Sequence, residues 1–168
     1  MRRDRIADLP YYPIGEELMD AEAGGQGEAP SGGGNSGTRP LIAVFNSSDD
    51  TVELLQAVLE QEGFRTVVGS IVDVKTGELD FVAFIEHHRP AVIVYDVSLP
   101  YEANWNFLRR LRSSEPVKAC KFIITTTNKL ALDKLVGQTE ALEIIGKPYD
   151  LQGVVGAVRA ALRQTLTS

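Results

Sequence analysis

From Pro40 onward, short runs of apolar residues alternate with longer segments whose apolar residues recur at helical spacing. Each run is bounded by polar or turn-forming residues, which is typical of a strand buried within a sheet. The runs predict five strands, over residues 41–45, 64–68, 91–95, 122–125 and 143–145. The intervening pattern predicts a first helix that begins at the polar residues 47–50 and ends at Gly63. Three further helices are predicted over 80–88, 104–112 and 129–136, and a turn-rich stretch is expected around 76–77. Asp150 is expected to cap a last helix that buries Leu151, Val154, Val155, Val158 and Leu162.

Five strand–helix pairs with short connections predict an α/β fold in which helices cover both faces of a parallel sheet. Right-handed crossovers restrict the topology, and we expect a flavodoxin-like (βα)5 three-layer sandwich with strand order 2-1-3-4-5. In such sheets the binding crevice lies at the carboxyl ends of the central strands.

Composition changes sharply at Arg39–Pro40. Residues 21–38 are rich in Gly, Ser and Ala and predict a flexible linker, because they offer little to bury. Before it, residues 9–19 form a small island of aromatic and aliphatic residues, which is either a docking motif or a frayed terminus. We therefore expect a flexible extension over residues 1–39 and one domain over residues 40–168.

The net charge of −6 does not favour nucleic-acid binding by this chain alone. A single cysteine, Cys120, excludes an internal disulfide and fits a reducing cytoplasm.

No apolar run approaches the roughly twenty residues that span a bilayer, and the start lacks the apolar core of a secretory signal, so no membrane association is expected. The chain is not expected to be an enzyme, since it has neither a Gly-rich phosphate loop after the first strand nor a Gly-x-Ser-x-Gly elbow.

Three chemically distinct side chains fall at the predicted carboxyl ends of separate strands. Asp96 ends the third strand, Thr126 the fourth and Lys147 the fifth. Each alone has an ordinary explanation, as a turn residue, a β-branched strand residue or a solvated charge. Together, at the edge where such sheets bind ligands, they predict a site for a small oxyanion.

The ordered set of motifs resembles the receiver domain of bacterial response regulators. The similar segments are VIVYDVSLP at 92–100, FIITTT at 122–127, GKPY at 146–149 and, in the first helix, ELLQAVLEQEGF at 53–64. The family pattern is a phosphoacceptor Asp followed four residues later by Pro, a Thr or Ser that ends the fourth strand, and a Lys-Pro that ends the fifth. The resemblance extends over about three quarters of the chain.

The resemblance implies that Asp96 accepts a phosphoryl group from a phosphohistidine on a partner. Lys147 and Thr126 would bind phosphoryl oxygens, because positioned cations and donors supply most of the catalysis in phosphoryl transfer. It also implies a cis Lys147–Pro148 bond. A Mg²⁺ site would include Asp96, the backbone carbonyl of Ser98 and the two residues that follow the first strand.

The chain departs from the family at those two residues. Asn46 and Ser47 stand where the family has adjacent acids, so we expect only weak Mg²⁺ binding, because this hard cation prefers carboxylate oxygens. Asp49 is expected to help cap the first helix, unless a shifted loop brings it toward the metal. Ile144 replaces a usually aromatic switch residue, which either blunts the switch or simply covers the core.

Two hypotheses follow. In the first, the chain is a phosphorylatable regulator without an output domain, because it ends at the fifth helix. Its partners would be a sensor histidine kinase or phosphotransfer protein, and a downstream protein on the face formed by helix 129–136, strand 143–145 and the last helix. In the second, it is a pseudo-receiver that acts without phosphorylation as a protein-interaction or dimerisation module. Asp96, Thr126 and Lys147 favour the first; Asn46, Ser47 and Ile144 favour the second.

Overall fold

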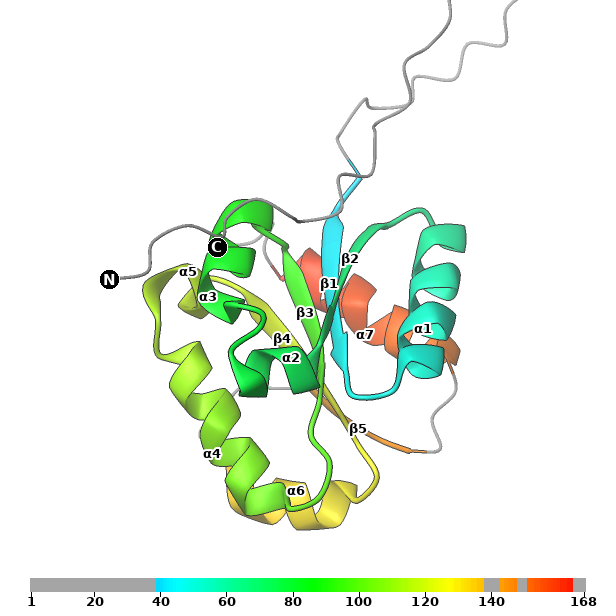
Figure 1. Ribbon diagram of the computed structural model, residues 1–168. Helices are drawn as coiled ribbons and strands as arrows, with labels where there is room; N and C mark the ends of the chain where they lie inside the picture. The colour runs from blue at the N-terminus through cyan, green and yellow to red at the C-terminus, as the bar shows by residue number, and fades with distance from the viewer. Residues whose placement is uncertain (1–38, 138–142, 148–150, 165–168) are drawn as a thin grey trace, which may run out of the picture. The chain divides into compact units, whose positions relative to one another are not determined.

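The computed structural model describes residues 39–137, 143–147 and 151–164. A parallel five-stranded sheet forms its centre, in the order β2-β1-β3-β4-β5 (Figure 1). This arrangement confirms the flavodoxin-like fold and strand order expected from the sequence. The strands are β1 (Leu41–Asn46), β2 (Arg65–Ser70), β3 (Val92–Asp96), β4 (Lys121–Thr126) and β5 (Glu143–Gly146).

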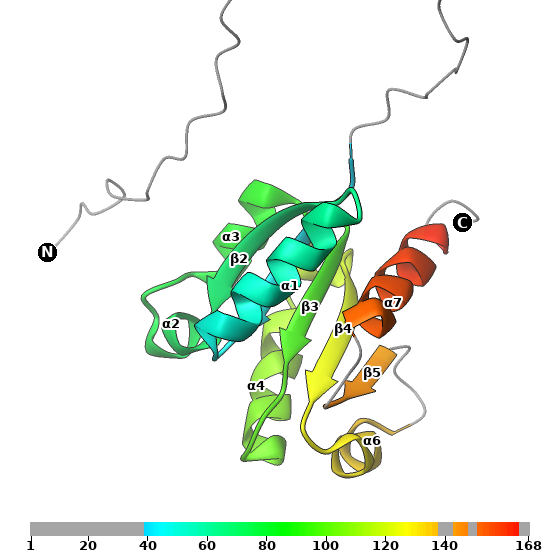
Figure 2. The same cartoon turned by 90° about the vertical axis from the view of Figure 1, so that its right-hand side faces the viewer.

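Helices cover both faces of the sheet (Figure 2). One face packs against α1 (Asp49–Gln61) and α7 (Leu151–Arg163). The other carries α2 (Ile71–Thr76), α3 (Phe81–His88), α4 (Tyr101–Arg112), α5 (Glu115–Lys118) and α6 (Lys129–Val136).

Two apolar cores follow from the alternation of side chains along the strands. In β3, Val92 and Val94 face α1 and α7, whereas Ile93 and Tyr95 face the opposite helices. Because both faces are covered, every residue of β3 is buried. The same alternation determines which side of the sheet each residue at a strand end faces, and Asp96 therefore lies on the α1/α7 side.

Two short helices were not predicted. The six residues of α2 replace part of the expected turn-rich stretch, and α5 is a single turn with Pro116 near its start. The helix α4 begins at Tyr101, three residues before the predicted start. The flexible extension, the Asp150 cap and the cis Lys147–Pro148 bond involve residues outside the described ranges. Among the described residues, no helix is long and apolar enough to cross a bilayer.

Candidate functional site at the strand ends

The structure brings Asp96 and Lys147 together from two different strands. Nζ of Lys147, one residue after β5, lies 2.8 Å from Oδ1 of Asp96, the last residue of β3. The Asp96 side chain is only 3% exposed, and that of Lys147 is 24% exposed. A buried carboxylate requires such a partner, because an unpaired charge in the interior is strongly unfavourable.

The neighbouring hydroxyl comes from Thr125 rather than Thr126. Thr125 lies opposite Asp96 in the β3–β4 pairing, so both side chains lie on the same face, and its Oγ1 donates a 2.8 Å hydrogen bond to Asp96 Oδ1. Thr126 is fully buried, and its Oγ1 accepts a 3.3 Å hydrogen bond from the backbone N–H of Asn128. Thr126 therefore holds the start of the β4–α6 connection, and within the described ranges no hydrogen bond joins it to the Asp96 carboxylate.

Backbone contacts hold the strand ends in place. The N–H of Lys147 donates to the carbonyl of Thr126 at 2.6 Å, and the N–H of Val97 donates to the carbonyl of Thr125 at 2.8 Å. These bonds join β5 and the β3–α4 loop to the end of β4. The sheet thus holds the backbone of Lys147, and the ion pair with Asp96 holds its ammonium.

Asn104 determines the position of the loop after β3. Its Nδ2 donates to the carbonyl of Ser98 at 2.8 Å and to that of Leu99 at 3.2 Å. Its Oδ1 accepts a 2.7 Å hydrogen bond from Nζ of Lys75. The Ser98 carbonyl, expected from the sequence as a metal ligand, therefore already accepts a hydrogen bond. The role of Asn104 was not foreseen, since nothing local in the sequence distinguishes it from other residues of its helix.

At the end of β1, neutral groups stand where the resemblance implies acids. Asn46 is 2% exposed and its Oδ1 accepts a 3.0 Å hydrogen bond from the N–H of Ser48. Ser47 is exposed. Ser48 caps α1, because its side chain accepts from the N–H of Thr51. Asp49 is exposed in the first turn, where its charge favours the helix dipole.

This donor set does not fit a magnesium site. Within the described residues, no group of three His, Cys, Asp or Glu side chains could hold a metal ion. Among the described residues, the site contains one buried carboxylate, that of Asp96, and this carboxylate is already paired with the ammonium of Lys147. A hard dication prefers several anionic oxygens, so these residues offer it little.

Beneath the site, Tyr95 faces the opposite core. Its hydroxyl is buried and has no hydrogen-bond partner among the described residues. Burial, and secondarily the charge of Asp96, raises the pKa of Tyr95 well above its ordinary value. Ile144 is also buried in this core, and its carbonyl accepts a 2.5 Å hydrogen bond from Nζ of Lys129. Ile144 thus covers the core as a strand residue.

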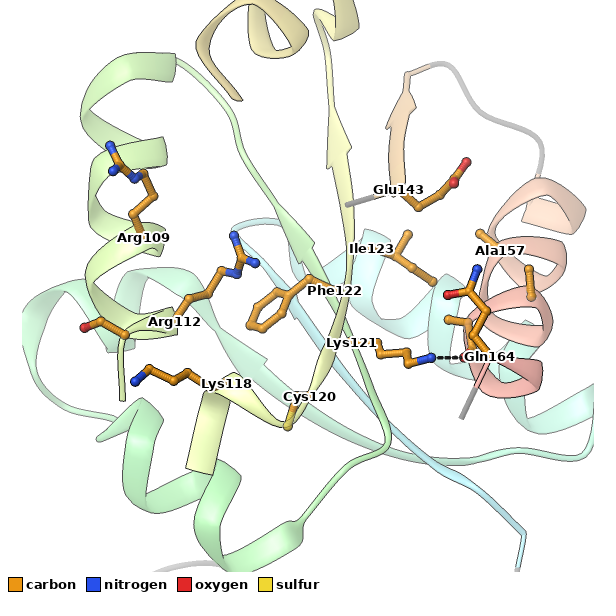
Figure 3. A pocket seen from close by; sticks show the side chains of 13 residues that line it. Arg109, Arg112, Lys118, Cys120, Lys121, Phe122, Ile123, Glu143, Ala157 and Gln164 are labelled. Carbon is orange, nitrogen blue, oxygen red and sulfur yellow. Dashed lines mark hydrogen bonds between the residues drawn. The ribbon is translucent and has the colours of Figure 1, made fainter. Parts of the chain in front are cut away.

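A separate cavity of about 810 Å³ lies at the other end of β4, between α4 and α7 (Figure 3). Arginine and lysine side chains line it, and two of them contact other groups of the protein. The Arg112 guanidinium lies 5.2 Å from the centre of the Phe122 ring, and Nζ of Lys121 donates to the carbonyl of Ala161 at 2.9 Å. Five residue steps along β4 separate Lys121 from the site edge, about 16 Å. The cavity is therefore distinct from the site of Asp96.

Three comparisons relate the chain to known proteins. It is 26% identical over 118 residues to the response regulator Rre1 of Synechocystis sp., which covers 69% of this chain and 48% of that protein. It is 25% identical over 122 residues to protein PilH of Pseudomonas aeruginosa, which covers 72% of this chain and 96% of PilH. A CheY-like response regulator receiver domain from Methylobacillus flagellatus matches with a TM-score of 0.56 and 17% identity, over 74% of this chain and 99% of that domain. No family model matches the chain.

The fold and the site define a flavodoxin-like domain with a buried aspartate and a lysine paired at the carboxyl edge of its sheet. Its relatives in sequence and its neighbours in structure agree on one family, and the described domain is similar to the receiver domains of response regulators. The chain spans about half the length of the first curated relatives that it matches.

Proposed function

We propose that the domain accepts a phosphoryl group on Asp96 from a sensor histidine kinase or a phosphotransfer protein, and signals through protein contacts. The observation that supports this best is the pairing of Asp96 with Lys147 at the edge where the family carries out its chemistry. Both hydrogen-bonding contacts of Asp96 involve Oδ1; within the described part of the chain, its Oδ2 accepts no hydrogen bond. Oδ2 is thus the oxygen available as a nucleophile.

The transfer balances as a displacement at phosphorus. Oδ2 of Asp96 forms the new O–P bond while the P–N bond of the donor phosphohistidine breaks. The imidazole leaves with the electron pair of that bond, and the nitrogen released from phosphorus takes up a proton. The negative charge of the phosphoryl oxygens in the transition state is stabilised by the Lys147 ammonium, which is held in place before the reaction.

The expected output surface is formed by α6, β5 and α7. Two leucines of α6, Leu130 and Leu135, are 75% and 40% exposed. Lys129 connects α6 to β5 through its bond to the Ile144 carbonyl, so a change at the end of β4 can reach this surface through a short connection. We propose that a downstream protein, or a second copy of the chain, binds here, and that the protein acts in the cytoplasm.

Incubation with acetyl phosphate, followed by intact-mass measurement, tests the proposal. The wild type should gain one phosphoryl mass, and Asp96→Asn should gain none. Asp49→Asn is a matched control, because Asp49 is an exposed aspartate outside the pair and its loss should leave the mass gain unchanged. Phosphorylation of Asp96→Asn to the wild-type level would exclude Asp96 as the acceptor.

A second function is favoured by one specific observation. The Asp96 carboxylate is already compensated by Lys147 and Thr125, and the end of β1 lacks acids, so the site is complete as a structural ion pair. A pseudo-receiver that binds proteins without phosphorylation would show no mass gain with acetyl phosphate or with a kinase. Its binding to partners would survive Asp96→Asn/Lys147→Met, which keeps the buried shape without the charges.

A further inference from the structure

The carboxamide of Asn46 is a buried polar group with an unused donor. Its Nδ2 has no hydrogen-bond partner within the described residues, although the side chain is almost fully buried. Because Oδ1 accepts the bond from Ser48, the orientation of the amide is determined: Nδ2 is the nitrogen. Buried donors are nearly always paired, so an unpaired one indicates a missing acceptor.

That donor belongs to the phosphoacceptor edge. In the β1–β3 pairing, Phe45 lies opposite Tyr95, so the next residues, Asn46 and Asp96, adjoin each other. Both side chains face the α1/α7 side, because Val44 and Val94, two residues earlier on each strand, pack in that core. An acceptor bound to Asp96 on this side lies next to the unpaired amide.

The charges at this edge leave no place for a dication. Asp96 contributes one negative charge and Lys147 one positive charge, so the pair is neutral before any ligand arrives. Asn46 offers only a neutral oxygen that is already bonded, and the Ser98 carbonyl already accepts from Asn104. A dication here would be repelled by the ammonium without the carboxylates that normally compensate for it.

We propose that Asp96 is phosphorylated without a divalent cation, with Asn46 Nδ2 and Lys147 Nζ as the donors to the phosphoryl oxygens. This inference rests on the proposed function. When acetyl phosphate is the donor, Oδ2 of Asp96 forms the O–P bond, the P–O bond to the acetyl group breaks, and acetate leaves with its electron pair. The phosphoryl group carries about two negative charges while the carboxylate loses its own, so the site gains about one net negative charge. The phosphoryl oxygens are then bound by the Lys147 ammonium and by an amide donor that was previously unpaired.

Phosphorylation measured with and without Mg²⁺ tests the inference. Initial rates of mass gain in EDTA and in millimolar Mg²⁺ should agree within about two-fold for the wild type, because the site lacks the anionic oxygens that Mg²⁺ requires. Asn46→Asp, which replaces the amide by a carboxylate of the same shape, should become at least about ten-fold faster with Mg²⁺ than in EDTA. Asn46→Ala removes the donor without adding charge, and should slow both conditions equally. Wild-type phosphorylation that occurs only with Mg²⁺ would overturn the inference and leave the proposed function standing.

Metal binding provides a second readout that does not depend on phosphorylation. Mn²⁺ broadens the amide NMR signals of nearby residues, and the wild type should show no selective broadening at Asp96 and Val97, whereas Asn46→Asp should. Selective broadening in the wild type would overturn the inference. If that broadening disappeared in Asp49→Asn, it would assign the metal to the acid in the first turn of α1. No mass gain in either EDTA or Mg²⁺ would instead exclude the proposed function and, with it, metal-free phosphorylation.

Discussion

Replacing Lys147 by methionine removes the cation that faces a buried carboxylate while keeping a side chain of similar length. At an effective dielectric constant near 20, two charges 2.8 Å apart attract each other by about 6 kcal/mol before desolvation is counted. Removal of one partner of a fully buried pair costs about 3–5 kcal/mol. Because the lysine side chain is 24% exposed and Thr125 keeps its bond to Asp96, the loss should be smaller, about 2–3 kcal/mol.

Urea unfolding followed by circular dichroism measures this loss. The midpoint should fall while the slope m stays constant, since the surface exposed on unfolding is unchanged. The matched variant Asp96→Asn/Lys147→Met removes both charges, and should recover to within about 1 kcal/mol of the wild type. A loss below about 0.5 kcal/mol in Lys147→Met, or a double variant as unstable as Lys147→Met, would show that the two charges are not coupled.

Three other substitutions test separate features by the same unfolding assay. Tyr95→Phe removes a buried hydroxyl without a partner among the described residues and should change the unfolding free energy by no more than about 1 kcal/mol. Because the raised pKa of Tyr95 favours the neutral phenol in the folded state, the contribution of Tyr95 to stability should be constant below about pH 10 and fall above it. The stability of this variant should therefore fall less steeply than that of the wild type above about pH 10. Thr125→Val should cost about 1–2 kcal/mol by removing a donor to Asp96, and an unfolding free energy equal to that of the wild type would contradict this hydrogen bond. Leu108→Ala should lower the unfolding free energy by about 3 kcal/mol, because it leaves a cavity at a fully buried position. A loss under about 1 kcal/mol would contradict tight packing of α4 against the core of the sheet.

The strands could be predicted because burial on both faces leaves a direct trace in the sequence. Each central strand is a short apolar run, and right-handed crossovers then restrict the order in which the strands pair. The short helix α2 left no such trace. Ile71 and Val74 are its buried residues, and six residues are too few to establish helical periodicity. The left-handed Gly77 that ends it is also typical of an ordinary turn.

The site was only partly predictable. Asp96 and Lys147 follow from the rule that ligand groups gather at the carboxyl ends of strands, and they lie together. The choice between Thr125 and Thr126 depends on register, which the sequence does not specify at a strand end. Side chains alternate between the two faces of the sheet along β4, so Thr125 lies on the same face as Ile123. Only the β3–β4 pairing shows that Asp96 lies on that face beside Thr125.

The two threonines determine how a signal could leave the site. Thr125 already donates to Asp96, so a phosphoryl group on that carboxylate can use its hydroxyl without any rearrangement. Thr126 faces the other core and accepts the bond from Asn128, the residue that caps α6. Contact between Thr126 and a phosphoryl group therefore requires the Thr126 side chain to move from the other face of the sheet, and we expect this movement to disturb its bond to Asn128 at the start of α6. If phosphorylation engages only Thr125, we expect α6 to stay unchanged. On the proposed function, a signal to the proposed output surface therefore depends on Thr126 and not on the hydroxyl already beside the carboxylate.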